Sequence, residues 1–175
     1  MDDTIENLLD AWLKSLNNKY GTSYIKEDIK NWNVASYFPM ATENDIFAPL
    51  LSNDFWTTVT PKEDAQIVLR QLIEDGHSVY IVTASSYQTL SSKMENLLFK
   101  YFPFLTWDNV IVTKAKQMIK GDILIDDGPH NLIDGDYRGI LMDMPHNRLF
   151  DEKNYGITRV KSWFEIPCII DKIAN

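Results

Sequence analysis

Residues 121–130 read GDILIDDGPH, and this stretch decides the fold class that the sequence predicts. Three apolar residues at 123–125 run directly into Asp126 and Asp127, and a Gly-Pro pair then interrupts regular structure. This order is typical of a short buried strand that delivers two carboxylates to the loop at its C-terminal end. Asp-Asp-Gly-Pro is also good turn chemistry, so the stretch by itself leaves a simple turn open. Ligands bind at that edge of open α/β sheets, where paired carboxylates suit a hard cation such as Mg²⁺.

The rest of the chain alternates predicted helices and strands around this stretch. Apolar residues at helical spacing predict helices over 5–16, 65–73, 90–101 and 162–173. Apolar runs rich in β-branched residues predict strands over 78–83, 110–113 and 139–142, with a further short one over 157–160. Capping boxes, Thr60 with Glu63 and Ser162 with Glu165, are expected to start two of the helices. This alternation predicts right-handed crossovers and an α/β fold: a doubly wound, Rossmann-like parallel sheet with helices on both faces.

The composition is that of an ordinary globular chain. Of the 175 residues, 45% are apolar and 24% charged, which is enough for one domain with a sizeable core. A net charge of -8 repels nucleic acid and anionic membrane surfaces, so neither is an expected partner. The single cysteine, Cys168, lies in an apolar segment and is predicted to be a buried thiol. No apolar run approaches the roughly 20 residues of a membrane span and no signal-peptide pattern opens the chain, so we expect a cytoplasmic location.

Residues 17–59, the cap segment, differ from the rest and predict a small helical cap inserted after the first helix. The core domain is then residues 1–16 and 60–175. One interpretation of its many aromatic residues is that a small insert needs large side chains for a core of its own; the other is a lid whose rings contact an aromatic ligand. The residues concerned are Tyr24, Trp32, Tyr37, Phe38, Phe47, Phe55 and Trp56.

Side chains that suit phosphoryl transfer stand at the predicted strand ends and at the start of the chain. In chain order they are Asp2 with Asp3, Thr83, Lys116, and the acidic pair at 126–127. Transfer through an aspartyl-phosphate needs a carboxylate nucleophile, a second carboxylate that shuttles protons, donors for the phosphate oxygens, and Mg²⁺ to neutralise charge. A Thr at a strand end is more often a cap, and a loop Lys is more often solvated. The prediction of phosphoryl transfer therefore rests on the order of these residues along the chain, each at a predicted strand end.

These residues resemble the four motifs of the haloacid dehalogenase superfamily, and the chain is similar to the 5'(3')-deoxyribonucleotidases and their bacterial relatives. The resemblance covers nearly the whole chain and implies the core and cap architecture of that superfamily. Beyond the motifs, it rests on Asp54-Phe55-Trp56 before Pro61, on Tyr101-Phe102-Pro103-Phe104, and on Met144-Pro145-His146-Asn147.

The resemblance also implies a role for each matching position. Asp2 would be the general acid/base that protonates the leaving nucleoside oxygen and then activates water, and its backbone carbonyl would reach Mg²⁺. Thr83 would hold the phosphoryl oxygens, and Lys116 would bridge the phosphoryl group and the nucleophile. Asp126 and Asp127 would bind Mg²⁺ directly or orient its waters.

Four further positions are candidates for substrate binding. Phe55 and Trp56 match positions that line the base pocket. Thr4 matches the Thr of the first motif, and Ser85 belongs to the hydroxyl cluster after the strand that ends at residue 83. Structural or solvated positions are expected for the three histidines, His77, His130 and His146.

The resemblance places the nucleophilic Asp, and the first core strand, directly before Met1. The sequence begins at Met1, so we expect an upstream strand that ends in Asp. Without it, the strands on either side of the sheet's centre would keep unpaired backbone groups. A shifted register with Asp2 as the nucleophile would put Thr4 in the acid/base position, and no proton shuttle would remain.

We therefore expect a magnesium-dependent phosphatase that hydrolyses (deoxy)ribonucleoside monophosphates through an aspartyl-phosphate intermediate. The expected partner is a small-molecule nucleoside monophosphate, and a homodimer is left open. The alternatives are a phosphatase of another small phosphomonoester and a non-catalytic Mg²⁺- or phosphate-binding protein. A receiver-type signalling domain would need a phosphoacceptor Asp at a strand end between the first acidic pair and Thr83, where this chain has the aromatic insert and one helix.

Overall fold

The computed structural model describes residues 1–174, so the predicted end of the core domain at residue 175 lies outside the described residues. Five short parallel strands form two hydrogen-bonded sheets in this part of the chain. One sheet pairs β1 (Ile81–Thr83) with β2 (Val110–Val112). The other has the order β3 (Ile123–Asp126), β4 (Arg138–Met142) and β5 (Thr158–Val160). The predicted α/β class is confirmed, but the described strands make two sheets where one was expected.

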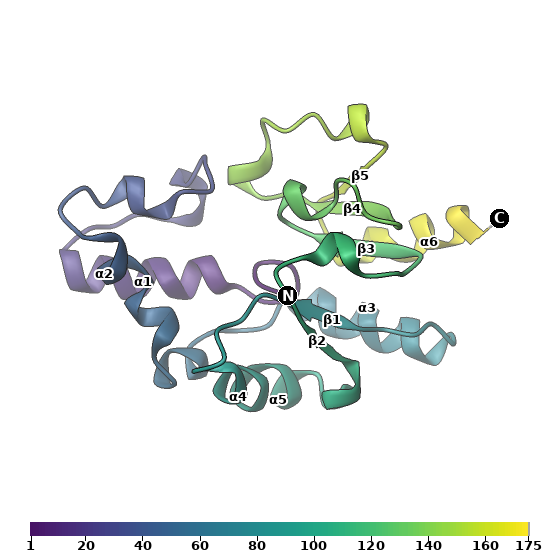
Figure 1. Cartoon of the computed structure of the whole chain (residues 1–175), viewed down its shortest axis with the longest axis horizontal. Coiled ribbons are helices and arrows are strands. Elements are labelled where there is room, and N and C mark those ends of the chain that lie inside the picture. The colour runs from purple at the N-terminus through teal and green to yellow at the C-terminus, as the bar shows by residue number, and fades with distance from the viewer. Residues whose placement is uncertain (175) are drawn as a thin grey trace.

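The break between the sheets lies between β1 and β3, and Figure 1 shows the N-terminus there. A cavity of about 950 Å³ lies between these strands, and residues 79–82 and 121–126 both line it. Most of the other lining side chains are apolar, among them Met1, Leu72 and Ile111. In the described chain β1 is paired with β2 alone and β3 with β4 alone, so one edge of each strand has no ladder partner. Unpaired edges at this place are what the resemblance to the superfamily predicted.

The longer helices follow the predicted apolar patterns, with shifted starts. They are α1 (Leu8–Tyr20), α3 (Glu63–Glu74) and α6 (Ile166–Ala174), and a continuous helical segment made of α4 (Leu90–Lys93), a π-helical turn η5 (Met94–Leu98) and α5 (Phe99–Tyr101). Short 3-10 turns in the core connect these elements: η6 (Trp107–Asn109), η7 (Lys116–Met118), η8 (Pro129–Asn131), η9 (Pro145–Asn147), η10 (Glu152–Tyr155) and η11 (Trp163–Glu165).

One of the two predicted capping boxes is confirmed and the other is wrong. Ser162 accepts a hydrogen bond from the backbone N–H of Phe164, and Glu165 accepts one from the N–H of Ser162, at the start of η11. Thr60 does not cap α3, which begins at Glu63 after Lys62. The reason is tertiary: residues 60–62 pair with the segment after the N-terminal turn, where Asn7 N–H donates to Thr60 O at 2.9 Å.

The cap segment folds into short helical pieces at one end of the molecule, at the left of Figure 1. They are η1 (Lys26–Asp28), η2 (Val34–Tyr37), α2 (Glu43–Phe47), η3 (Ala48–Leu51) and η4 (Asp54–Thr57). Phe38 is fully buried and packs against the rings of Tyr20 and Tyr24. Trp12 of α1 donates from Nε1 to the backbone oxygen of Ile46 at 2.7 Å. These aromatic residues therefore build a local core, as the first of the two interpretations expected.

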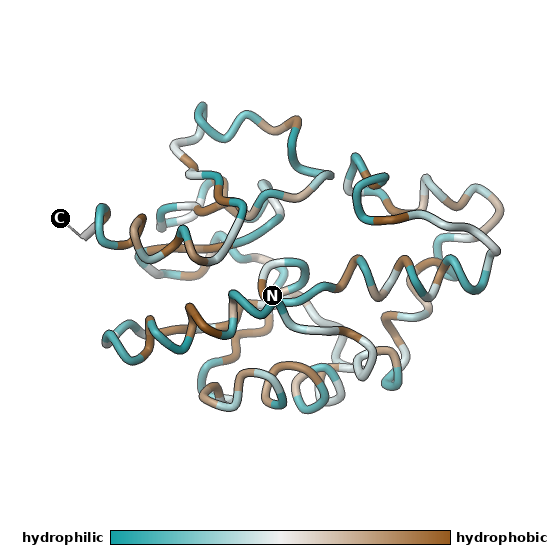
Figure 2. The backbone as a smooth tube through the Cα atoms, turned by 180° about the vertical axis from the view of Figure 1, so that it is seen from behind, coloured by the Kyte–Doolittle hydropathy of each residue, from teal (hydrophilic) through white to brown (hydrophobic). Residues whose placement is uncertain are grey.

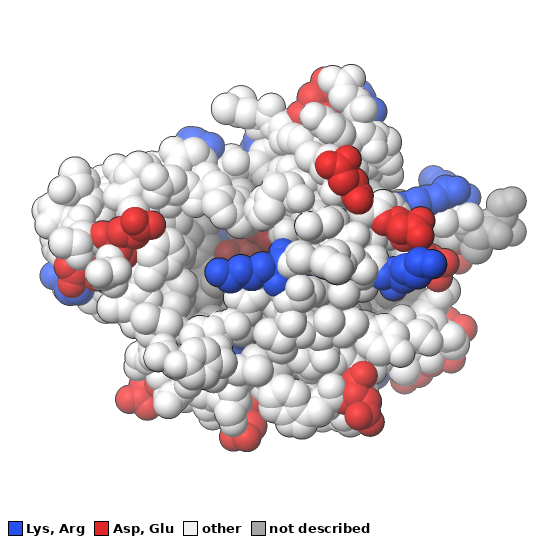
Figure 3. Space-filling view, viewed as in Figure 1, with Lys and Arg blue, Asp and Glu red and all other residues white. Residues whose placement is uncertain are grey.

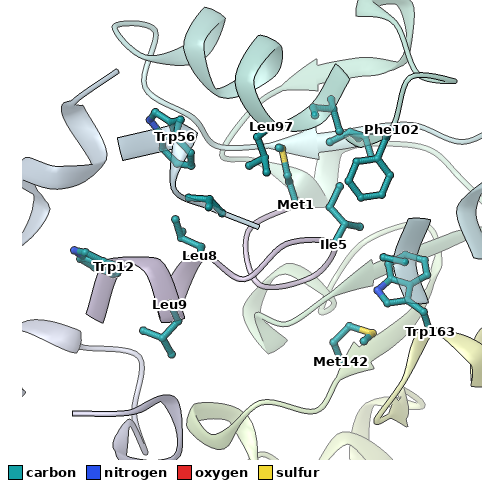
Figure 4. Close-up of a cluster of buried hydrophobic side chains, with 14 of the residues drawn as sticks. Met1, Ile5, Leu8, Leu9, Trp12, Trp56, Leu97, Phe102, Met142 and Trp163 are labelled. Carbon is teal, nitrogen blue, oxygen red and sulfur yellow. The ribbon is translucent and has the colours of Figure 1, made fainter. Parts of the chain in front are cut away.

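The main hydrophobic core joins the N-terminal turn, the helices and the strands. Figure 4 shows Met1 and Ile5 beside Leu97 and Phe102, with Trp163 on the other side of the turn. Trp163 donates from Nε1 to the backbone oxygen of Thr4 at 2.8 Å, which fixes the turn against η11. The alternation of apolar and polar residues along the helices is visible in Figure 2.

No helix within residues 1–174 is long and apolar enough to cross a membrane.

The prediction that Cys168 is a buried thiol is wrong, because its side chain is exposed on α6. Ile166, two residues earlier on the same helix, is the residue that enters the core. An apolar segment of the sequence thus contributes one face to the core and leaves the other to solvent.

Candidate active site

Three of the predicted residues meet at the C-terminal ends of two strands. Asp126 is the last residue of β3, and Lys116 opens η7 in the preceding loop. The Lys116 Nζ atom lies 2.5 Å from Asp126 Oδ2, and both side chains are buried. Asp127 follows directly and is buried as well. The structure therefore places the predicted loop lysine, Lys116, in contact with the predicted acidic pair.

The second oxygen of Asp126 is held by the loop that follows. Its Oδ1 atom accepts from the backbone N–H of Gly128 at 2.8 Å and from Asn131 Nδ2 at 2.9 Å. A Cβ atom at residue 128 would lie 2.8 Å from the His130 ring and 3.1 Å from this oxygen, so a larger residue there would have to displace these side chains. Burial opposes ionisation of Asp126, but the charges of Lys116 and of the Met1 amino group, with the hydrogen bonds from Lys116 and Asn131, outweigh it, and the pKa of the carboxyl is lowered. Asp126 is therefore a fixed, ionised carboxylate.

Asp127 contacts residues from three other segments. Its Oδ1 atom lies 3.5 Å from the Thr4 hydroxyl, and its Oδ2 atom lies 3.2 Å from His146 Nε2. Asn147 donates from Nδ2 to the backbone oxygens of Asp127 and Met142, both at 2.8 Å. No catalytic or binding role was predicted for His146 or Asn147, although both lie in the Met-Pro-His-Asn motif that supported the resemblance.

The cap segment reaches this end of the core through one tryptophan. The Trp32 ring stands edge-on to His130 and His146, with centroid distances of 5.0 and 4.8 Å. Both histidines were expected to be structural or solvated, and the buried contact of His146 with Asp127 is compatible with a structural position. Figure 3 shows acidic atoms at the bottom of a hollow between the cap segment and the core, partly covered by a basic side chain.

Thr83 ends β1, is buried, and pairs its hydroxyl with that of Ser85 at 2.9 Å. A lysine that sequence reasoning missed, Lys93 of α4, lies 3.5 Å from the Thr83 hydroxyl and also contacts the carboxylate of Asp2. Loss of solvent contact opposes ionisation of Asp2, but the Lys93 charge outweighs it, so the pKa of this carboxyl is lowered.

Phe55 and Trp56 lie in η4, are both buried, and pack edge to face with ring centroids 5.4 Å apart. The Lys93 ammonium sits over the Trp56 ring, 4.5 Å from its centroid. The two predicted groups of residues, one for phosphate and one for the base, are thus connected in the structure through a single side chain.

The oxygen-rich donor set at this end fits a hard cation. Asp127 and Asp126, with the backbone carbonyl of Asp2, offer only oxygen atoms, as Mg²⁺ prefers. Within residues 1–174 no group of three or more His, Cys, Asp or Glu side chains could hold a metal by itself, so water or a ligand would complete the coordination. Carboxylates are also crowded here: burial first, and the charge of Asp127 second, raise the pKa of Asp3 to about 8. A cation would relieve that repulsion.

Asp3 gives the stability of the protein a dependence on pH that can be measured. The pKa of Asp3 is about 8 in the folded protein and 3.8 in the unfolded chain. Between these pH values the folded protein holds the proton and the unfolded chain has lost it. This contribution to the free energy of unfolding is complete below about pH 4 and is lost as the pH rises to 8, on the order of a few kcal/mol. Urea titrations in a chelating buffer should show this decline, and Asp3→Asn should flatten it while still accepting the Leu9 N–H bond. An Asp3→Asn chain with the full wild-type slope would contradict the assignment.

The chain is similar to known nucleotidases, in agreement with the phosphate-transfer residues gathered at this site. A family model described as "5' nucleotidase, deoxy (Pyrimidine), cytosolic type C protein" matches residues 1–174. The chain is 36% identical over 169 residues to a 5'(3')-deoxyribonucleotidase of Bacillus subtilis (strain 168), covering 95% of this chain and 92% of the relative. It is 28% identical over 175 residues to a 5'(3')-deoxyribonucleotidase of Clostridium acetobutylicum, covering 100% of this chain and 94% of the relative.

A solved structure adds evidence for the fold. The crystal structure of a haloacid dehalogenase family hydrolase from Deinococcus radiodurans R1, with bound phosphate and sodium, superposes with a TM-score of 0.63 at 14% identity. The match covers 95% of this chain and 89% of that one. The resemblance stated from the motifs is confirmed. The chain belongs to the cytosolic type C 5' deoxynucleotidase family, a family of phosphoric monoester hydrolases with the haloacid dehalogenase fold.

Proposed function

We propose that the protein is a Mg²⁺-dependent phosphatase that hydrolyses deoxyribonucleoside or related nucleoside monophosphates through an aspartyl-phosphate. The observation that carries this proposal is the buried Lys116–Asp126 pair at the strand ends, with Asp127 beside it. A bound cation beside the fixed ammonium of Lys116 would stabilise the negative charge of a phosphoryl group during its transfer. The names of the relatives from Bacillus and Clostridium support a nucleotide as substrate.

Each residue then has a defined task. Thr83 and Ser85 donate hydrogen bonds to the phosphoryl oxygens, and Lys116 lies between these oxygens and the attacking carboxylate. Asp2, which is ionised beside Lys93 and must first take up a proton, gives that proton to the leaving nucleoside oxygen and then takes one from the attacking water. Asp126, Asp127 and the backbone carbonyl of Asp2 would hold Mg²⁺, which would neutralise the charge of the phosphoryl group.

The attacking carboxylate belongs at the end of the cavity between β1 and β3. A strand parallel to both would end beside Thr83 and Asp126, and an Asp as its last residue would face the bound phosphate. Asp2 is not assigned this task, because Thr4 would then stand in the acid/base position. The hydroxyl of Thr4, which would then have to shuttle the proton, lies against the Asp2 carbonyl and Asp127.

The cap segment is proposed to bind the nucleoside. Phe55 and Trp56 stand on the cap side of Lys93, and Trp56 Nε1 is buried with no hydrogen-bond partner among the described residues. A polar atom of a bound base or sugar could accept from this donor. Loss of base preference after Trp56→Leu would support this assignment, and an unchanged preference would count against it.

Cation removal tests the proposed chemistry directly. For a chain that carries the attacking Asp before Met1, release of phosphate from a nucleoside monophosphate should fall by on the order of 100-fold or more when a chelator is present, and added Mg²⁺ should restore it. Asp127→Asn should raise the Mg²⁺ concentration needed for half-maximal rate, because one charged oxygen donor becomes a neutral one. Equal rates with and without chelator would rule out the cation, and equal rates for nucleotides and sugar phosphates would favour the broader phosphatase alternative.

A further inference from the structure

Lys93 is a buried charge that the proposed chemistry leaves without a task. Its side chain is 1% exposed, although lysine is almost never fully buried unless it is paired. Burying an ammonium is unfavourable because it loses its hydration, so the contacts of Lys93 must compensate for the lost water. Those contacts are therefore informative about why the lysine is there.

The contacts of Lys93 belong to both ends of the site. On the phosphate side, its ammonium contacts the Asp2 carboxylate and lies 3.5 Å from the Thr83 hydroxyl. On the cap side, the same ammonium lies over the ring of Trp56, a cation–π contact. Glu6, fully buried, is a second carboxylate 3.9 Å away. One atom thus touches residues that are far apart in the sequence and that belong to the two predicted parts of the molecule.

The helix that carries Lys93 is itself attached to the cap segment. Thr89 donates from its hydroxyl to the backbone oxygen of Leu50 at 3.3 Å, and Ser92 donates to that of Asn53 at 2.8 Å. Both acceptors come shortly before Trp56 in the chain. A π-helical turn follows Lys93 at once, and such turns are frequent at functional sites. Figure 4 shows Trp56 close to this helix and Met1 across from it.

We propose that Lys93 is a positioning residue that holds the Trp56 segment of the cap at a fixed distance from Asp2 and Thr83, so that the site prefers a phosphate attached to a nucleoside. This inference rests on the proposed function and deepens it by naming what sets the preference. Lys93 does not contact the reacting atoms; it acts through Asp2 and Trp56.

The test compares two ligands that differ only in the base. Calorimetry gives the affinities of the full chain, with Mg²⁺, for a deoxyribonucleoside 5'-monophosphate and for 2-deoxyribose 5-phosphate. Lys93→Met keeps the apolar stem and removes the charge, and should lower the ratio of the two affinities about tenfold, the size of a desolvated cation–π contact. Lys93→Arg keeps both contacts and should restore the ratio to within about threefold. Lys100→Met, an exposed lysine over the Tyr101 ring further along the same helical segment, is the matched control and should change nothing.

Two results would overturn the inference. Lys93→Met could weaken both ligands equally, or Lys93→Arg could fail to restore the preference, and either would leave Lys93 as a general structural charge. If Lys93→Met does not fold, the affinity ratio of Trp56→Leu is compared with that of the double variant Lys93→Arg/Trp56→Leu. Arg at position 93 should restore the ratio only when the Trp56 ring is present, so the two variants should have the same ratio. A wild-type chain with equal affinity for the two ligands would overturn the proposed nucleoside specificity itself, and this inference with it.

Discussion

A chain extended before Met1 by about five apolar residues and a final Asp is expected to hydrolyse deoxyribonucleoside monophosphates on the order of 10⁴-fold faster than the same extension ending in Asn. The two chains differ by one oxygen-for-nitrogen replacement, so both should form the same strand and only the first carries a nucleophilic carboxylate. Only the Asp extension offers a nucleophile at the strand end beside Thr83, Lys116 and Asp126. Release of inorganic phosphate measures the difference.

The cavity explains why such an extension should bind where it is needed. β1 and β3 each have one edge without a ladder partner, and residues 79–82 and 121–126 line the space between them. Met1 lies in the cavity wall, so residues before it would enter between the strands. A strand there would satisfy backbone groups on both edges, which is the reason to expect a higher melting temperature for both extended chains.

The amino group of Met1 gives a further reason. Burial first, and the nearby charge of Lys116 second, lower its pKa, so an ionisable group stands in a place that disfavours its charge. An extension converts this amine into an uncharged amide. If the Asp and Asn extensions both raise the melting temperature but neither shows turnover, the strand would be correctly placed and the nucleophile assignment wrong. If neither raises it, the cavity does not take a strand.

Site residues that stand at the ends of strands or in the loops after them could be predicted from the local sequence pattern. A strand that ends in Asp126, a strand that ends in Thr83, and a loop lysine at 116 follow from apolar runs and their breaks, and parallel strands bring such ends to one edge. Lys93 could not be found in this way, because its neighbours read as an ordinary helix and its partner Asp2 is 91 residues away. The failed cap at Thr60 has a similar cause, since pairing with the N-terminal segment overrides the local signal.

The contact of Trp32 with His130 and His146 was also outside the reach of sequence reasoning. It depends on how the cap segment is placed over the core loops, and no local spacing reports that. The break between β1 and β3, by contrast, could be expected from the resemblance alone. Long-range placement, rather than secondary structure, is therefore the part of the site that needed coordinates.

Lys116→Met should be among the most destabilising single changes in the protein. It leaves Asp126 buried and ionised without its counter-charge, and breaking such a pair costs about 3 kcal/mol or more. For a chain of this size, that corresponds to a fall in melting temperature of roughly 6–12 °C. Lys19→Met, which removes the lysine of the exposed pair with Asp45, is the matched control and should leave the melting temperature almost unchanged.

The double variant Lys116→Met/Asp126→Asn separates the pair from its surroundings. Asn at 126 can still accept from Gly128 N–H, and neither buried charge remains. We therefore expect it to be more stable than Lys116→Met alone, while both lose turnover because the phosphate has lost its fixed ammonium. Destabilisations that simply add would show that Lys116 and Asp126 do not stabilise one another, and the proposed charge arrangement at the phosphate site would then be wrong.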